Sequence, residues 1–181
     1  VGAAVATVTS TDALTWTTRT NATVADLFGI GSPGTGSAVV VGAGGAIATS
    51  SDGTTWTAQT SGTTKNLYGA VYGNGRYVVV GAAGAVLTST DGIAWTVVAV
   101  NTTNDLRSVG FGTQTTTTGT GASATTVTTN TFVAVGAAGT VLTSNDGLTW
   151  TLRTALSANT LNSVTFGGQF VTVGNAGSIF T

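Results

Sequence analysis

The chain has 181 residues and a formal net charge of −1, and only 6% of its residues are charged, against about a quarter in an average soluble domain. It contains no Cys, His or Met, and its acidic residues are all Asp. This composition excludes a disulfide framework and thiol chemistry, and the absence of clustered Lys and Arg argues against a nucleic-acid partner.

The abundant Thr, Gly, Ala and Val suit strands solvated by hydroxyl groups, which is typical of an extracellular, cell-surface or virion-associated β protein. A chain surrounded by neighbours in a large assembly would have the same composition. We expect no membrane insertion, since no apolar run is long enough to span a bilayer. No signal peptide is recognisable, and the start inside a strand-like run suggests a processed or partial chain.

An eight-residue segment, called the octet below, occurs at residues 10–17, 50–57, 89–96 and 144–151 and contains every Trp of the chain. Asp-Gly between β-prone runs predicts a tight turn, because Gly takes a positive φ without strain. Ala13 replaces this Gly in the first octet, so that turn must differ or be strained. We assign a structural role to Asp12, Trp16, Asp52, Gly53, Trp56, Asp91, Gly92, Trp95, Asp146, Gly147 and Trp150.

Apolar runs between the octets predict short strands in a repeating order. Residues 4–9 form an incomplete unit, followed by repeat units at about 10–49, 50–88, 89–143 and 144–181. In the best-defined unit the strands are expected at 67–72, 77–81, 85–88 and 93–97. Octet spacings of 40 and 39 residues are typical of propeller blades, and the third spacing of 55 contains an insertion.

The insertion, residues 113–130, is rich in Thr, Gly and Ser and joins the first and second strands of its blade. It is either an extended hairpin that reaches toward a partner or an irregular loop. Loops of this length are often functional. The candidate contact residues in it are Thr113, Gln114, Thr118, Thr126 and Asn130.

The octet resembles the Asp-box of bacterial neuraminidase (BNR) repeats, written loosely Ser-x-Asp-x-Gly-x-Thr-Trp, with one residue fewer between Asp and Gly. The whole unit is more similar to the repeats of photosystem II assembly-factor-like and other bacterial surface β-propellers. The resemblance implies that residues 1–181 form a single all-β domain, a β-propeller of four-stranded antiparallel blades. About four blades are expected, either closed on themselves or part of a larger or oligomeric ring. We favour a ring closed by joining the two termini.

The sequence offers no candidate catalytic residues. Nucleophilic triads and zinc sites need His or Cys, which are absent. Sialidases with Asp-boxes use three clustered arginines and a Tyr–acid pair, whereas Arg19 and Arg153 occupy equivalent positions in different units and Glu is absent. Asp26 and Asp105 also occupy equivalent positions, each before the Leu that opens a first strand, which favours a turn-capping role. We expect no enzyme activity, no cofactor and no metal site, since no acidic loop is clustered enough for calcium.

Three functions remain open. The first is a non-catalytic extracellular structural or adhesive module, such as a surface-fibre or virion component, acting through self-association or contacts with other protein chains. The alternative is a glycan- or peptide-binding propeller that uses the first-strand aromatics Tyr68, Tyr72 and Phe111. The second alternative is an assembly factor. The basic patch expected of that family is not visible here, so we favour the first function.

Overall fold

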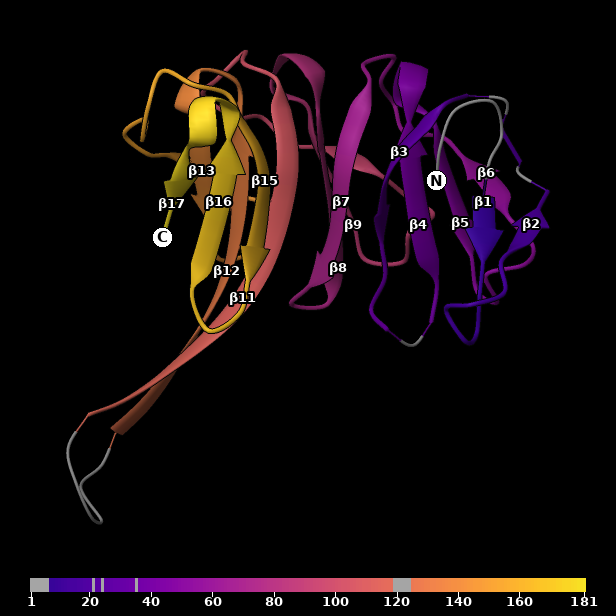
Figure 1. The fold of residues 1–181 in the computed structure, drawn as a ribbon, viewed down its shortest axis with the longest axis horizontal. Helices are drawn as coiled ribbons and strands as arrows, with labels where there is room; N and C mark the ends of the chain where they lie inside the picture. Colours follow the sequence, from indigo (N-terminus) through magenta and orange to yellow (C-terminus); the bar gives the residue numbers. More distant parts are fainter. Residues whose placement is uncertain (1–6, 21, 24, 35, 119–124) are drawn as a thin grey trace.

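The computed structural model describes residues 7–20, 22–23, 25–34, 36–118 and 125–181; in these ranges the regular elements are strands and short 3-10 turns. The strands form five antiparallel sheets in chain order (Figure 1). The first sheet is β1 (Thr7–Thr9) and β2 (Thr17–Arg19). Three four-stranded sheets follow, and β15 (Leu161–Phe166), β16 (Phe170–Gly174) and β17 (Ile179–Phe180) form the last one.

The four-stranded sheets share one strand order, in which each strand pairs with the next along the chain. One contains β3 (Leu27–Gly31), β4 (Ala38–Gly42), β5 (Ile47–Ser50) and β6 (Thr57–Gln59). The next contains β7 (Leu67–Gly73), β8 (Arg76–Gly81), β9 (Val86–Ser89) and β10 (Thr96–Val97). The third contains β11 (Leu106–Thr118), β12 (Thr125–Gly136), β13 (Val141–Ser144) and β14 (Thr151–Leu152).

The second strand of each four-stranded sheet is the centre of the core. Val39, Val40 and Val41 in β4 are fully buried, as are the residues Val78–Val80 in β8. A strand buried on both faces carries a continuous apolar run, because neighbouring sheets cover both sides. The cores therefore lie between successive sheets, which is how blades pack in a propeller.

The first strands of neighbouring sheets lie side by side, β3 against β7, β7 against β11 and β11 against β15. Glycine allows this approach: a Cβ on Gly29 would lie 2.7 Å from the carbonyl oxygen of Tyr68 in the next sheet. Each first strand therefore runs close to the axis about which the sheets are arranged. The prediction of an all-β propeller of four-stranded antiparallel blades is confirmed.

The described strands form an open arc and not a closed ring (Figure 1). β1 and β2 lie at one end of the arc and β17 lies at the other. The expected closure through the termini is therefore wrong for this structure. The reason is visible in the pairing: β2 already pairs with β1, with Thr17 opposite Thr9, so that edge of β2 is not free to extend the last sheet.

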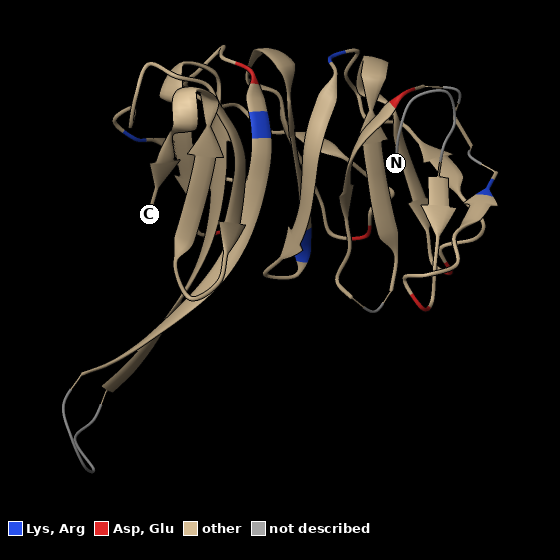
Figure 2. Ribbon diagram, in the orientation of Figure 1, with Lys and Arg blue, Asp and Glu red and all other residues tan. Residues whose placement is uncertain are grey.

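The insertion lengthens β11 and β12 into a hairpin that projects from the body of the molecule (Figure 1). We call its described residues, 113–118 and 125–130, the arm. They pair in register from Thr113 opposite Asn130 to Thr118 opposite Thr125. Charged side chains are sparse over the whole molecule and absent from the arm (Figure 2).

Candidate functional site

The octet turns are organised around their Asp carboxylates. Asp52 Oδ1 accepts the backbone N–H groups of Thr54 and Thr55 at 2.7 and 2.8 Å and the hydroxyl of Ser50 at 2.9 Å. The N–H of Thr55, then that of Thr54, and the Ser50 hydroxyl lower the pKa of Asp52 from 3.8 to about 2. The same bonds recur around Asp12, Asp91 and Asp146, whose pKa values are also lowered. All four carboxylates are therefore ionised at neutral pH, and each stabilises its turn by accepting these hydrogen bonds.

Three of the four octet tryptophans pack into the body of the molecule. Trp56 and Trp150 are buried, with 7% and 8% of their surface exposed, and Trp95 is half-buried. Trp16 is different, since 60% of its surface is exposed. Trp16 does not pack between two sheets, because β1 and β2 have no preceding sheet among the described residues against which its ring can lie.

The turn glycines have the backbone that the sequence predicts. Gly53, Gly92 and Gly147 have φ values of 69°, 77° and 71°. Ala13, at the equivalent position of the first octet, has a φ of 59°. The first turn is thus the same turn as the others, formed by a residue that is strained in it.

The arginines do not converge on one point. Arg19 Nε donates to Thr9 Oγ1 and Arg153 Nε donates to Thr143 Oγ1, each at 2.7 Å, across neighbouring strands of separate sheets. Gln59 makes the equivalent bond to Thr49 at 3.0 Å. In these three units the residue three positions after the octet Trp ties its strand to the strand before it, whereas Val98 occupies this position in the remaining unit.

Asp105 caps a turn in a neighbouring sheet, a contact that sequence reasoning did not locate. Its Oδ1 accepts the backbone N–H of Ala83 at 2.9 Å, and Asn66 Oδ1 accepts that of Gly44 at the same distance one sheet earlier. The cap therefore joins one blade to the next, whereas the sequence only suggested that some turn was capped.

The surface formed by the first strands carries the most distinctive set of exposed groups. Position two of each first strand is occupied by Phe28, Tyr68, Arg107 and Asn162, which we call the first-strand row. The Phe28 and Tyr68 rings lie 5.9 Å apart, and the Arg107 guanidinium carbon lies 6.0 Å from the centre of the Tyr68 ring. Phe28 is 44% exposed, and Arg107 and Asn162 are exposed too.

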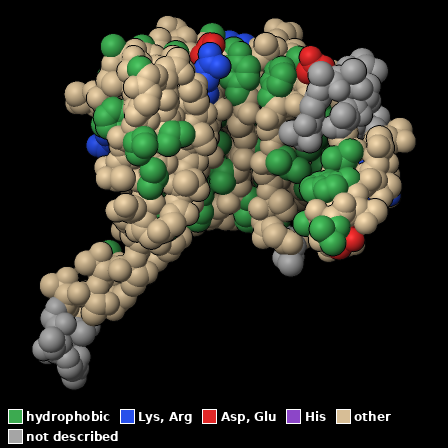
Figure 3. Space-filling view, viewed as in Figure 1, with side chains coloured by type: hydrophobic (Ala, Val, Ile, Leu, Met, Phe, Trp, Pro, Cys, Tyr) green, Lys and Arg blue, Asp and Glu red, His purple; other side chains and the backbone are tan. Residues whose placement is uncertain are grey.

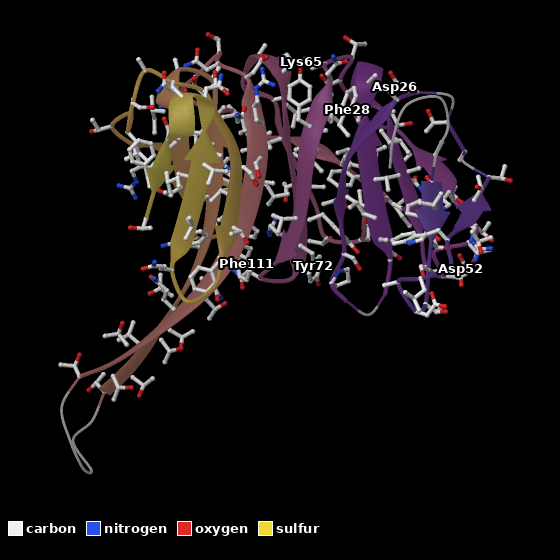
Figure 4. The ribbon with its side chains drawn as sticks, in the orientation of Figure 1. Asp26, Phe28, Asp52, Lys65, Tyr72 and Phe111 are labelled. Atoms are coloured by element: carbon white, nitrogen blue, oxygen red, sulfur yellow. The ribbon has the colours of Figure 1, made fainter. Side chains whose placement is uncertain are left out.

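The three aromatic residues proposed from sequence lie at two different ends of the first strands (Figure 4). Tyr68 belongs to the row, at the end where Phe28, Asp26 and Lys65 lie. Tyr72 and Phe111 lie at the other end, half-buried against Tyr77 and Phe132 at ring separations of 4.8 and 4.7 Å. Tyr72 and Phe111 therefore pack mainly against the core. The row members that the sequence argument missed are Phe28, Arg107 and Asn162.

The arm carries the candidate contact residues in an exposed threonine ladder. Thr113 donates its hydroxyl to Asn130 Oδ1 at 2.9 Å, and the hydroxyls of Thr117 and Thr126 lie 3.2 Å apart. Gln114 and Thr118 are exposed on the same hairpin. Asn130 Nδ2 donates to Asn74 Oδ1 at 3.2 Å, so the base of the arm is tied to the β7–β8 turn.

Neither a membrane-spanning helix nor a metal centre is found in the described part of the chain. None of its helices is long and apolar enough to cross a membrane. Across the same residues, no three His, Cys, Asp or Glu side chains are grouped so that they could hold a metal ion.

Comparison with known proteins supports the fold. No family model matches the sequence, and no curated protein matches it. Among solved structures the chain is similar to YCF48 bound to D1 peptide, with 18% sequence identity and a TM-score of 0.66. The match covers 99% of this chain and 57% of that one, so this chain spans little more than half the length of that protein. At this identity the likeness establishes the β-propeller fold and no more.

Proposed function

We propose that the chain is a non-catalytic propeller module that binds a segment of another protein on the first-strand row. The observation that carries this proposal is the surface contact of Phe28, Tyr68 and Arg107, which come from three successive sheets; Phe28 and Arg107 are exposed and Tyr68 is half-buried. Aromatic rings and Arg are enriched where proteins bind one another, because they give large contact area and directed polar contacts. Binding to a peptide by YCF48, a protein of the same fold, supports a peptide-sized partner.

The row favours a partner segment with an apolar and an acidic side chain. The two rings offer an apolar platform of limited size, and the guanidinium beside them can pair with a carboxylate through two parallel hydrogen bonds. Lys65 and Asp26 both lie at this end of the sheets, so their charges offset each other and Arg107 is the group that pairs with the carboxylate (Figure 4). The proposed function is therefore closer to that of an assembly factor, which binds a segment of another protein, than to that of a structural or adhesive module.

A peptide-display selection tests this function without knowledge of the partner. We expect a random-peptide library panned on the wild-type chain to enrich acidic–apolar sequences. Tyr68→Ala and Arg107→Ala should each weaken binding of the selected peptides by roughly tenfold or more. Ile93→Ala is the control variant. It also truncates a large surface side chain, which is 59% exposed, but Ile93 lies in an octet turn and outside the first-strand row. Equal binding by all four chains would reject the row, and selective binding to a glycan array would favour a glycan ligand instead.

The arm supports a second candidate function, a structural or adhesive component at a cell surface or in a virion. Its threonine ladder is uncharged and projects away from the sheets, so it exposes two strand edges to neighbours (Figure 1). We propose the extracellular location on the low charge content of the chain. Replacing residues 113–130 by the Gly-Asn-Gly turn of residues 73–75 should leave thermal unfolding unchanged. It should abolish incorporation of the chain into the virion or cell-surface structure that contains the wild-type chain. Unimpaired incorporation would reject this role.

A further inference from the structure

The arm is a long sheet edge on a molecule whose outer edges are otherwise short. The fourth strands β6, β10 and β14 have only three, two and two residues. The arm adds six paired residues to each of β11 and β12, and it stands clear of the body of the molecule (Figure 3). In the part of the chain that the structure describes, each strand of the arm pairs only with the other. A two-stranded ribbon is marginally stable in water, so a further strand would stabilise the arm.

The arm lacks the features that usually keep a strand edge from pairing, which are charged side chains, Pro and β-bulges. Residues 113–130 contain no charged residue and no Pro. The register shift of β11 lies between Leu106 and Ser108, outside the arm, and the described pairs of the arm follow one another without a shift. Because the arm has no charge to offer to a charged strand, it favours an uncharged partner such as the arm of a second copy. The net charge of −1 gives two copies little mutual repulsion.

The backbone of β12 presents hydrogen-bonding groups to its outer side at every second residue. The N–H of Gly136 donates to the carbonyl oxygen of Thr140, just before β13, at 3.0 Å. Alternate residues of an antiparallel strand direct their N–H and C=O groups to the same side, so Thr126 and Thr128 direct theirs to the side of β13. The side chains agree with this assignment: the hydroxyls of Thr117 and Thr126 lie 3.2 Å apart, as in a non-hydrogen-bonded pair, where side chains are closer.

Val127 is the apolar residue in the middle of this edge. Its side chain is 56% exposed, and its own N–H and C=O face Thr116, its partner on β11. Two identical strands that pair antiparallel are related by a two-fold axis, so one residue can lie opposite itself. With Val127 on the axis, the two exposed side chains cover each other in a non-hydrogen-bonded pair. Thr126 then exchanges backbone hydrogen bonds with Thr128 of the other copy.

We propose that β12 of the arm pairs with β12 of a second copy, antiparallel about Val127, so that two arms form one four-stranded sheet. Thr125 then lies opposite Thr129 of the other copy, and the bodies of the two molecules lie at opposite ends of the joined arms. The contact involves neither the first nor the last sheet. It rests on the second candidate function in taking the arm as a contact element, and it gives that function a partner. Peptide binding by the first-strand row does not depend on it.

Single-cysteine cross-linking tests the predicted register, and the absence of native Cys makes it specific. The Cα atoms of a non-hydrogen-bonded pair lie about 4.5 Å apart, within the range of about 4.4–6.8 Å that a disulfide spans. Val127→Cys should therefore form a disulfide-linked dimer under mild oxidation. Thr116→Cys is the matched control: Thr116 is exposed and lies opposite Val127 on the same hairpin. In the joined sheet it lies about 14 Å from its copy, across three strand spacings.

A pair of variants on the same strand tests the register a second time. Thr125→Cys and Thr129→Cys should each cross-link poorly alone, because each residue is displaced from its own copy by four residues, or about 14 Å along the strands. Mixed together, they should form the mixed disulfide in preference to either dimer of one variant. The proposal is supported if this occurs and if Val127→Cys forms dimers at least several times faster than Thr116→Cys. Equal rates for Val127→Cys and Thr116→Cys, or faster cross-linking of Thr116→Cys, overturn it.

Sedimentation tests the pairing without cysteine chemistry. The wild-type chain should associate as its concentration rises. Val127→Lys should weaken this association roughly tenfold or more, because it places a charge at the paired edge, whereas Thr116→Lys should leave it nearly unchanged. Equal weakening by the two variants, or a wild-type chain that stays monomeric at high concentration, overturns the proposal. Both results come from the purified chain, so they leave incorporation through the arm and peptide binding by the first-strand row to their own tests.

Discussion

The indole N–H of Trp95 donates to the carbonyl oxygen of Gly92 at 2.9 Å, so the turn that precedes the ring also fixes its orientation. Trp150 makes the same bond to Gly147 at 3.3 Å. In these two octets a carboxylate holds the turn, a glycine takes the positive φ and the ring reaches the space between two sheets. The shared roles explain why Asp and Trp recur in all four octets and Gly in three of them.

Truncation of the octet tryptophans should separate packed from exposed copies. We expect Trp150→Ala to lower the free energy of unfolding by about 3–5 kcal/mol, because it leaves a cavity among Val78, Val80 and Phe132. Trp16→Ala should change it by less than about 0.5 kcal/mol, since the ring is mostly in solvent. Urea unfolding at low protein concentration measures both. Equal losses would show that Trp16 is packed in solution.

Stability should fall in acid through the octet carboxylates. The pKa of Asp146 is lowered from 3.8 to about 2, first by the N–H of Thr149 and then by that of Leu148. A pKa lowered in the folded state gives stability that is present above the unfolded value and lost as the pH falls toward the folded value. The melting temperature should therefore be nearly constant above about pH 5 and should decrease between about pH 4 and pH 2.

The Asp146→Asn variant should isolate one such carboxylate. It should melt below the wild-type chain at about pH 6 and approach it at about pH 2, because the charge that distinguishes the two is lost in acid. Thermal scans across this range measure the difference. A constant difference in melting temperature between the two chains would show that the ionised carboxylate does not stabilise the turn.

The two kinds of octet turn should respond in opposite ways to a change of the turn residue. Ala13→Gly should stabilise the first turn by about 0.5–1 kcal/mol, since Ala at a φ of 59° is strained. Gly92→Ala should destabilise the chain by about 1–3 kcal/mol, because its Cβ would lie 3.2 Å from Val39 Cγ2 and its φ is 77°. Amide hydrogen exchange at Leu14 and Ile93 reports the local effects. A loss of protection in Ala13→Gly would contradict the strain argument.

Much of the fold follows from the sequence because the pattern is local and repeated. The Asp-Gly turn and the buried run Val78–Val80 each specify their own conformation from a few neighbouring residues. Ring closure depends instead on whether β2 pairs with β1 or with the last sheet. The two pairings would be similar, and no local sequence pattern distinguishes them. The first-strand row was missed for a related reason: Phe28 and Arg107 become neighbours of Tyr68 only when three separate sheets are placed together.

The bond between Asp105 and Ala83 links two sheets, so its loss should loosen the packing of one blade on the next. Asp105→Ala removes the acceptor at 2.9 Å and should cost about 1 kcal/mol of unfolding free energy. Asp105→Asn keeps an acceptor oxygen and should lose much less. Asn66→Ala, which removes the equivalent bond to Gly44, should match Asp105→Ala. Faster amide exchange at Ala83 in Asp105→Ala, but not in Asp105→Asn, would locate the effect at this cap. If amide exchange at Ala83 is accelerated equally in both variants, the carboxylate charge, and not the hydrogen bond, stabilises the contact.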